Sequence, residues 1–539
     1  MSGALLTLAA VPPLRALAVA CLALGCAEPP VSPPRLAVRV DVGSEPTGPP
    51  ISPRLFGANA IWIDGGQGLV RRGTGEPDPA TIEAVKALGV ALIRFPGGTL
   101  SHAYRFMDGI GPMAGRKPGH DVFQNRAVES DYGFDEFMRC AALAGAEPIV
   151  CLNWKTGSPA ESAAFVAYAN ARPEDATPLG MDAGGRDFGT AGDWARRRAE
   201  NGRAEPYGVK LIEVGNETNL RRFGETVADY ARGYRAHAEA VRRVDPSARL
   251  FAPGNLEMGT PGMKEEKTPG ALPWNDTLLR EAGALLDGLA LHYYATERGA
   301  EGGAAKLLLE PARLEAAVME LRERAAAFRP AGAPPLGIAI TEYGTFFRAE
   351  GDAGFTAENA SPRTALFQAS VLLAAARLGI DAACLHALLL EKPANDDLAG
   401  GVYFGMLRRE RPGAPIERAP IALVFPEARR ALAGAVPVGV RLSGDRLAAG
   451  VEPVDAFASR DPATGETRVV LVARAAVDSV ALDVGGEGVG SATLTLVAAD
   501  SLDAREARRE ERPLEVGADG RVRIVLPPAA FAVVRLRAR

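Results

Sequence analysis

Short apolar runs alternate with longer amphipathic segments from about residue 52 to residue 430. A strand that is buried on both faces appears as a continuous apolar run, whereas a helix that covers a sheet shows a period of 3.6 residues. The alternation therefore predicts βα units around a parallel sheet. Eight such apolar runs occur, at 55–63, 91–95, 148–154, 209–214, 250–253, 289–294, 337–341 and 382–389.

Helical patterns lie between these runs, at 79–88, 134–144, 160–169, 225–243, 311–327 and 361–378. Pro311 suits the first position of its helix, where its missing N–H costs nothing. Eight strands with intervening helices are what a closed (β/α)8 TIM barrel needs, so this α/β fold is the first choice. An open doubly wound sheet is the second, because no glycine-rich GxGxxG turn follows the first strand.

The pattern changes after residue 430. Runs rich in β-branched residues, separated by Gly, Asp and Pro, predict a C-terminal antiparallel β-sandwich, with strands at 468–473, 479–484, 492–497, 521–526 and 531–536. Val38, Val40 and Val42 alternate with Arg39 and Asp41, so residues 35–48 are predicted to form an N-terminal strand that joins this sandwich. The barrel is then expected over 49–430 and the sandwich over 431–539.

The first 26 residues resemble an export signal. Arg15 supplies a positive charge, residues 16–24 form an apolar stretch too short to span a bilayer, and Gly25-Cys26 follows. Residues 23–26 resemble a bacterial lipoprotein cleavage site, so an envelope lipoprotein, periplasmic or at the surface, is the first interpretation. A cleaved signal peptide on a secreted protein and an uncleaved anchor are the alternatives. The Pro-rich segment 27–34 is then an extended tether.

Composition limits the partners. The 539 residues are 47% hydrophobic and 24% charged, with a formal net charge of -5, which is ordinary for a globular protein. Without a basic excess, nucleic acid is not an expected partner, and membrane contact is expected only through a lipid anchor on Cys26. Cys140, Cys151 and Cys384 lie in apolar runs and show no metal-binding spacing, so no cofactor and no metal are expected.

Two glutamates come at the ends of predicted strands. Glu217 follows the fourth apolar run, and Glu342 follows the seventh. Catalytic groups of α/β barrels lie at the C-terminal ends of their strands. Hydrolysis of a glycosidic bond needs one carboxylic acid and one carboxylate, which stand roughly 5 Å apart in retaining enzymes. The pair is therefore a candidate active site, and two solvated strand-end carboxylates are the competing interpretation.

Neighbouring polar residues suit the same site. Asn216 offers an amide to a sugar hydroxyl, although it could equally cap a loop. His292 and Tyr294 are two residues apart and share a face of the sixth strand, where a phenol aimed at the nucleophile would favour its ionised form. A His/Tyr pair in the core is the alternative. Arg94 is a charge inside a strand and needs a buried partner, for which a carboxylate nucleophile or a structural ion pair would serve.

Several motifs together resemble glycoside hydrolase family 51 of clan A. They are Arg94-Phe95-Pro96-Gly97-Gly98, residues 132–137 leading to Asn153, residues 198–202 and 205–217, Leu291-His292-Tyr293-Tyr294, and Glu342. The resemblance implies that Glu217 is the acid/base and Glu342 the nucleophile of a retaining hydrolase. It also implies that Asn153 binds substrate together with Arg94, Asn216, His292 and Tyr294. Most members act on terminal α-L-arabinofuranosyl groups, so an exo-acting α-L-arabinofuranosidase on polysaccharide side chains is expected, with carbohydrate as its partner.

The sugar-binding positions depart from the family pattern. The first strand of the family carries a glutamate where this chain has Ala60-Ile61-Trp62-Ile63-Asp64, and Thr99 replaces an asparagine. Tyr343-Gly344 follows the nucleophile in place of Trp-Asn. A related clan A β-xylosidase or β-glucuronidase, or a non-catalytic glycan-binding envelope lipoprotein, therefore stays open. Aromatic residues that could stack on sugar rings are Trp62, Tyr104, Trp154, Phe346 and Phe347.

Overall fold

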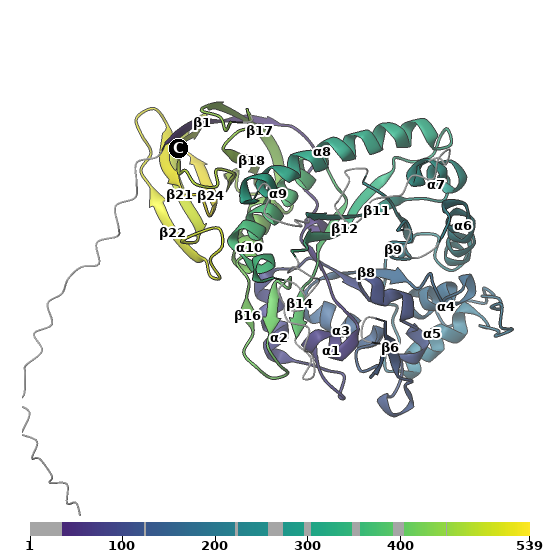
Figure 1. The fold of residues 1–539 in the computed structure, drawn as a ribbon. Coiled ribbons are helices and arrows are strands. Elements are labelled where there is room, and N and C mark those ends of the chain that lie inside the picture. The colour runs from purple at the N-terminus through teal and green to yellow at the C-terminus, as the bar shows by residue number, and fades with distance from the viewer. Residues whose placement is uncertain are drawn as a thin grey trace, which may run out of the picture. The chain divides into compact units, whose positions relative to one another are not determined.

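The computed structural model describes residues 35–122, 125–220, 225–256, 273–295, 303–347, 356–391, 404–448 and 450–539. Eight parallel strands close into a barrel, some of whose strands are labelled in Figure 1. Their order around the barrel is β10-β11-β12-β13-β2-β5-β8-β9. They are β2 (Gly57–Asn59), β5 (Leu92–Phe95), β8 (Glu147–Leu152), β9 (Leu211–Val214), β10 (Arg249–Pro253), β11 (Gly288–Ala295), β12 (Gly337–Thr345) and β13 (Ala382–Leu385). Each predicted apolar run contributes one of them, and the predicted barrel is confirmed.

Helices surround the barrel. They are α2 (Pro79–Leu88), α3 (Phe134–Ala144), α4 (Pro159–Asn170), α5 (Ala191–Glu200), α6 (Val227–Val244), α7 (Trp274–Ala282), α8 (Gly303–Phe328), α9 (Pro362–Leu378) and α10 (Ile421–Leu432). The prediction that Pro311 begins a helix was wrong, because α8 starts eight residues earlier, at Gly303. Leu307 and Leu308 are buried, so packing of the preceding turn outweighs the hydrogen bond that Pro311 cannot make.

The inside of the barrel holds an apolar layer below a charged one. The apolar layer is Leu92, Ile149, Leu211, Phe251, Ala290, Ala339, Ala382 and Cys384. Side chains two apart on a strand point to the same face, so Arg94 follows Leu92 into the barrel and Glu213 follows Leu211. Because side chains alternate between the two faces of a strand, charged residues point into the barrel next to the apolar layer, on its C-terminal side.

A nine-stranded, mostly antiparallel sheet forms the other part of the fold, in the order β22-β21-β24-β19-β18-β17-β1-β20-β23. It contains β1 (Leu36–Pro46), β17 (Val436–Gly444), β18 (Val454–Arg460), β19 (Thr467–Ala473), β20 (Val480–Gly486), β21 (Val489–Ala498), β22 (Arg508–Leu514), β23 (Arg521–Leu526) and β24 (Ala530–Ala538). Side chains from both halves of the sheet share one core, as in a sandwich. The N-terminal strand joins it as predicted, since β1 pairs with β17 and β20.

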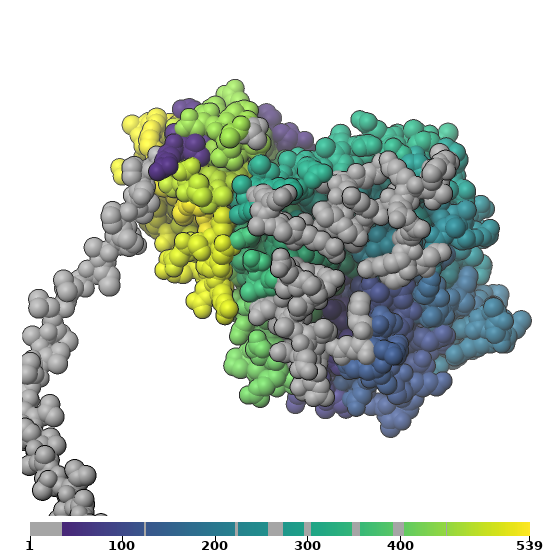
Figure 2. Space-filling model, viewed as in Figure 1, coloured from purple at the N-terminus to yellow at the C-terminus, as the bar shows by residue number. Residues whose placement is uncertain are grey.

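The C-terminal strands pack beside α9 and α10, as Figures 1 and 2 show. Arg377 of α9 forms an ion pair with Asp455 of β18 at 3.0 Å, and Ser459 donates to the carbonyl of Ala431 in α10. Among the helices that the structure describes, none has the length and apolarity needed to cross a membrane. The signal, lipidation and tether predictions for residues 1–34 lie outside the described residues, and the exact domain boundaries stay predictions.

Candidate active site

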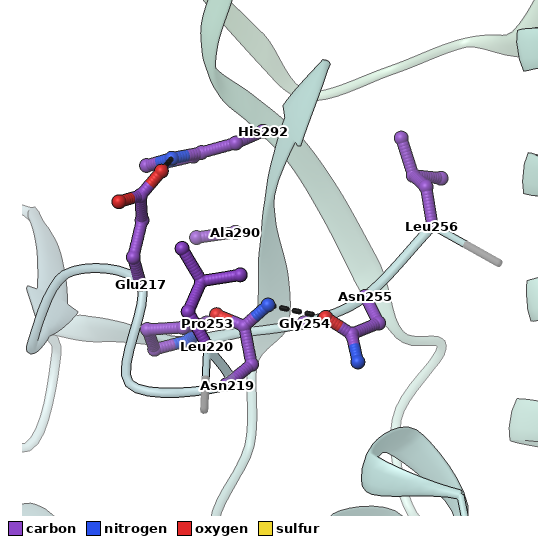
Figure 3. Close-up of a pocket in the computed structure, with 9 residues that line it drawn as sticks. All are labelled: Glu217, Asn219, Leu220, Pro253, Gly254, Asn255, Leu256, Ala290 and His292. Carbon is purple, nitrogen blue, oxygen red and sulfur yellow. Dashed lines mark hydrogen bonds and ion pairs between the residues drawn. The ribbon is translucent and has the colours of Figure 1, made fainter. Parts of the chain in front are cut away.

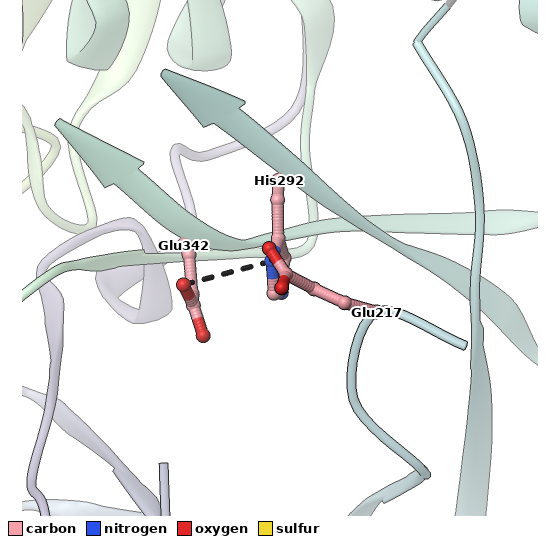
Figure 4. A group of neighbouring side chains, drawn as sticks. All are labelled: Glu217, His292 and Glu342. Atoms are coloured by element: carbon pink, nitrogen blue, oxygen red, sulfur yellow. Dashed lines mark hydrogen bonds and ion pairs between the residues drawn. The ribbon is translucent and has the colours of Figure 1, made fainter. Parts of the chain in front are cut away.

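Glu217, His292 and Glu342 converge at the C-terminal ends of β9, β11 and β12 (Figure 4). One carboxylate oxygen of each glutamate and one ring nitrogen of His292 all lie within 4.8 Å of one another. His292 stands between the carboxylates, with Nδ1 3.1 Å from Oε1 of Glu217 and 3.6 Å from Oε2 of Glu342. The two glutamates of the sequence prediction therefore face each other at the spacing of a retaining pair.

A β-bulge aims Glu342 into the barrel. The pairing of β11 with β12 advances from Leu291↔Ile340 to His292↔Glu342, so Thr341 is an extra residue. Without the bulge, strict alternation would point Thr341 inward and Glu342 outward. With it, Thr341 donates to Glu213 in the barrel while Glu342 reaches Arg94.

A strained turn presents Glu217. Gly215 has a φ of 88° and Glu217 a φ of 49°, which is uncommon for a residue with a side chain. A Cβ at position 215 would lie 2.9 Å from Cβ of Trp154, so only glycine fits there. The conformation turns the chain sharply after β9 and leaves Glu217 facing His292.

Arg94 is the buried cation of the site. Its guanidinium is fully buried and donates to Glu213 at 2.6 Å and to Glu342 at 2.9 Å. It also donates to the side-chain oxygens of Asn59 and Asn216, both at 2.8 Å. Burial would lower the pKa of Arg94, but the nearby carboxylates raise it well above its usual value. Arg94 therefore carries a permanent charge beside Glu342.

Glu342 is held as a carboxylate. Burial alone would raise its pKa, but the electrostatic effects of His292, His386 and Arg94 outweigh burial. The hydroxyl of Tyr294 also donates to Oε2 at 2.5 Å. Together these groups lower the pKa of Glu342 to about 2. An ionised carboxylate with both oxygens oriented by hydrogen bonds can act as a nucleophile.

The Pro-Gly-Gly turn after β5 brings backbone without side chains close to these groups. A Cβ at Gly97 would lie 2.5 Å from the carbonyl oxygen of Ala60, so the turn passes close to the first strand. Gly98 adopts φ 60° and ψ −166°, a region that only glycine populates. Gly98 thus lies near Glu342 without adding a side chain there.

Asn153 does not join the group. Its amide donates to the carbonyl of Tyr104 and to Oγ1 of Thr156, and its Oδ1 accepts from the backbone N–H of Thr156. The side chain thereby closes the turn after β8. Substrate binding by Asn153 stays a prediction.

The residues after the first strand that differ from the family pattern also have structural roles. Asp64 pairs with Arg126 at 2.5 Å and with Arg72 at 3.7 Å, so its carboxylate serves ion pairs there. Trp62 is buried and donates from its indole to the carbonyl of Leu100. Of the five aromatic candidates for sugar stacking, Phe346 lies next to the site, stacked on Tyr294 with ring centroids 4.0 Å apart.

Glu213, Asn59 and His386 belong to the site but were not predicted from the sequence. Glu213 is a charge inside an apolar run, two residues after the inward Leu211, and this could have identified it as the partner of Arg94. Asn59 lies on the strand next to β5, and its role depends on that neighbour. His386 follows β13, and only the folded barrel places it 3.9 Å from Glu342.

A small pocket adjoins Glu217 on the β9–β11 side (Figure 3). Asn219 and Asn255 form its polar wall, where the amide of Asn219 donates to the side chain of Asn255. Its lining residues are Glu217, Asn219, Leu220, Pro253, Gly254, Asn255, Leu256, Ala290 and His292. Glu342 is not among them, so the pocket lies on the Glu217 side of the site.

The same three side chains, Glu217, His292 and Glu342, have the spacing of a metal site. However, the guanidinium of Arg94 lies 2.9 Å from Glu342 and would repel a cation bound to that carboxylate. Tyr294 already occupies Oε2 of Glu342 as a hydrogen-bond donor. The donor set therefore suits proton transfer and nucleophilic attack better than metal binding.

Part of the chain resembles known proteins in sequence. Residues 84–307 match the family model described as the alpha-L-arabinofuranosidase 1 domain. Probable alpha-L-arabinofuranosidase C of Aspergillus clavatus is 31% identical over 218 residues, which are 40% of this chain and 39% of the relative. The intracellular exo-alpha-(1->5)-L-arabinofuranosidase of Streptomyces lividans is 28% identical over 45% of this chain and 35% of the relative. The chain thus spans less than half the length of these curated relatives.

The fold is matched over a longer range. The alpha-L-arabinofuranosidase of Thermotoga maritima superposes with a TM-score of 0.74 and 20% identity, covering 93% of this chain and 99% of that one. The family 51 arabinofuranosidase of Xanthomonas axonopodis pv. citri gives the same TM-score and identity over 93% and 100% of the two chains. The resemblance seen in the sequence motifs is confirmed to this extent: residues 84–307 match an alpha-L-arabinofuranosidase domain, and the chain shares the fold of family 51 arabinofuranosidases.

Proposed function

We propose that this protein is a retaining glycoside hydrolase, an exo-acting α-L-arabinofuranosidase that removes side chains from polysaccharides. The observation that carries the proposal is the pair Glu217 and Glu342, whose carboxylate oxygens approach within 4.8 Å. Retaining enzymes place their carboxyl groups about 5–5.5 Å apart, whereas inverting enzymes need room for a water molecule between them. The names of the sequence relatives support the arabinofuranosyl substrate.

The first step forms a covalent glycosyl-enzyme intermediate. A carboxylate oxygen of Glu342 attacks the anomeric carbon, and the bond from that carbon to the leaving oxygen breaks. Glu217, protonated at this stage, gives its proton to the leaving oxygen, so the aglycone departs as a neutral alcohol. The pocket lined by Asn219 and Asn255 adjoins Glu217 and suits the polar leaving group.

The second step reverses these roles. Glu217, now a carboxylate, takes a proton from water, and the resulting hydroxide attacks the anomeric carbon. The ester bond to Glu342 breaks, which restores its carboxylate and releases a sugar of unchanged anomeric configuration. Arg94 and Tyr294 hold the released carboxylate, while Asn216 and His292 line the substrate side.

The test is a panel of 4-nitrophenyl glycosides with α-L-arabinofuranosyl, β-D-xylosyl, β-D-glucuronosyl and β-D-glucosyl groups. We expect turnover of the arabinofuranoside and its loss in Glu342→Ala. Glu217→Ala should keep part of the activity on this good leaving group and gain rate with azide, since azide needs no general base. Turnover of another glycoside instead would reassign the sugar, and turnover of none would refute the exo-glycosidase.

We also propose that the protein is exported and anchored through Cys26. The support is the sequence of residues 1–26, with its apolar stretch and terminal Gly-Cys. Cells that express the full chain should incorporate labelled palmitate into it and retain it in the membrane fraction. Cys26→Ser should abolish both, and unchanged labelling of that variant would contradict the anchor.

A further inference from the structure

His386 lies on the opposite side of Glu342 from the acid/base pocket. It follows β13 directly, and its Nδ1 is 3.9 Å from Oε2 of Glu342. The imidazole stacks on Phe404 with centroids 5.4 Å apart and meets Tyr294 edge to face. Its side chain is only 11% exposed. Packing therefore fixes the ring beside the nucleophile.

Nδ1 of His386 is a buried polar atom without a hydrogen bond to any residue that the structure describes. The distance of 3.9 Å to Glu342 is too long for one. Leaving a buried polar atom unsatisfied is costly, so such an atom in a native site indicates a missing partner. Burial lowers the pKa of His386, which favours the neutral ring. A neutral imidazole can donate to a hydroxyl or accept from one.

Gly98 lies close to both His386 and Glu342. A Cβ at this glycine would stand 3.7 Å from Cε1 of His386 and 3.9 Å from Oε1 of Glu342. The bare backbone of Gly98 therefore faces both groups. A sugar whose anomeric carbon bonds to Glu342 would lie close to His386 as well.

The described segment that follows β2 offers no available polar side chain on this side of the site. β13 pairs with β2, so His386 is the neighbour of the strand that leads to Ala60. Ala60 contributes no polar side chain, and Asp64 is engaged with Arg72 and Arg126. On this side of the nucleophile, among the described residues, His386 offers a buried polar atom that is still unsatisfied.

We propose that His386 is a substrate-binding residue that forms a hydrogen bond with the hydroxyl group on the carbon next to the anomeric carbon. That hydroxyl is the substituent nearest to the reacting centre, and hydrogen bonds to it strengthen in the transition state of glycosidases. The glycone must therefore carry a free 2-hydroxyl. This inference rests on the proposed glycosidase function and deepens it.

The experiment pairs protein variants with a substrate lacking the hydroxyl. His386→Phe keeps a ring that can stack on Phe404 but removes both nitrogens. His386→Asn keeps a polar atom near the position of Nδ1, whereas His386→Gln places it near Nε2. The ratio of kcat/KM for 4-nitrophenyl α-L-arabinofuranoside to that for its 2-deoxy analogue is measured for each, together with the unfolding temperature.

We expect His386→Phe to reduce the ratio about tenfold, the size of one lost neutral hydrogen bond. This ratio of kcat/KM values should be closer to the wild-type value in His386→Asn than in His386→Gln. That comparison can be made even if the Phe variant does not fold. A variant that slows both substrates equally would overturn the inference, because His386 would then act only on Glu342. Inactivity of the wild-type protein on both substrates would instead overturn the proposed function.

Discussion

Tyr294→Phe removes one oxygen atom from the site and tests how Glu342 is kept ionised. The hydroxyl of Tyr294 donates to Oε2 of Glu342 at 2.5 Å, in a buried environment. The ring itself stacks on Phe346, so a phenylalanine should keep its place. The variant should therefore fold normally and differ from the wild type in the acidity of Glu342.

The size of the effect follows from the hydrogen bond. A hydrogen bond to a charged group contributes about 1.5–3 kcal/mol, and one pKa unit corresponds to about 1.4 kcal/mol. Loss of the phenol should therefore raise the pKa of Glu342 from about 2 by about one to two units. Since only the carboxylate attacks, activity is lost as the pH falls through this pKa.

The assay is the pH dependence of kcat/KM on 4-nitrophenyl α-L-arabinofuranoside from about pH 2 upward, which reports ionisations of the free enzyme. The acidic limb of Tyr294→Phe should move to higher pH by one to two units. Tyr293→Phe is the matched control, because this neighbour faces the other side of β11 and packs against Phe367. Superimposable acidic limbs of Tyr294→Phe and wild type would refute the reasoning, as would an equal shift in Tyr293→Phe.

Three further variants test the supporting structure. Arg94→Met should lower the free energy of unfolding, measured by urea titration, by about 3–5 kcal/mol, because it leaves the buried Glu213 without its ion-pair partner. The double variant Arg94→Met/Glu213→Gln should recover part of this lost stability. If the double variant is no more stable than the single one, the buried charge is not the cause. Burial lowers the pKa of His237 from 6.5 to about 4. Between these pH values the histidine is protonated in the unfolded chain but not in the folded protein, so the stability of the fold decreases as the pH drops from 6.5 to 4. His237→Gln should flatten the unfolding temperature across this window, and an unchanged slope would assign it to other groups. Gly97→Ala should lower the unfolding temperature far more than Gly434→Ala. Both glycines have a φ of 74°, but only a Cβ at Gly97 would clash, with the carbonyl oxygen of Ala60. Similar losses in the two variants would mean that the structure relaxes to relieve the clash.

Much of the fold could be predicted from local patterns. The boundaries of α2 and α3 agree with the predicted ranges to the residue. Both helices end at a left-handed glycine, Gly89 and Gly145, which is a local stop signal. α5, α7 and α10 were missed, as were strands β17, β18 and β22. β22, for example, is a run of charged residues, and its pairing with β21 rather than its own pattern makes it a strand.

The candidate site was predictable only in part. Strand ends mark Glu217 and Glu342, because a barrel collects them at one face whatever its details. The inward direction of Glu342 could not be predicted, since it depends on a bulge at Thr341 that the sequence pattern does not reveal. Nor could Asn153 be separated from the other candidates, because its amide closes a turn that forms only in the folded loop.

The sequence by itself determined the eight barrel strands, the two carboxylates and the need of Arg94 for a partner. These properties follow from periodicity and from the cost of burying a charge, both of which are local. The tertiary structure decided that Arg94 joins Glu213 to Glu342, and that His386 stands beside the nucleophile with Nδ1 unsatisfied. Those contacts depend on closure of the barrel, which brings together residues far apart in the chain at distances that no local pattern fixes.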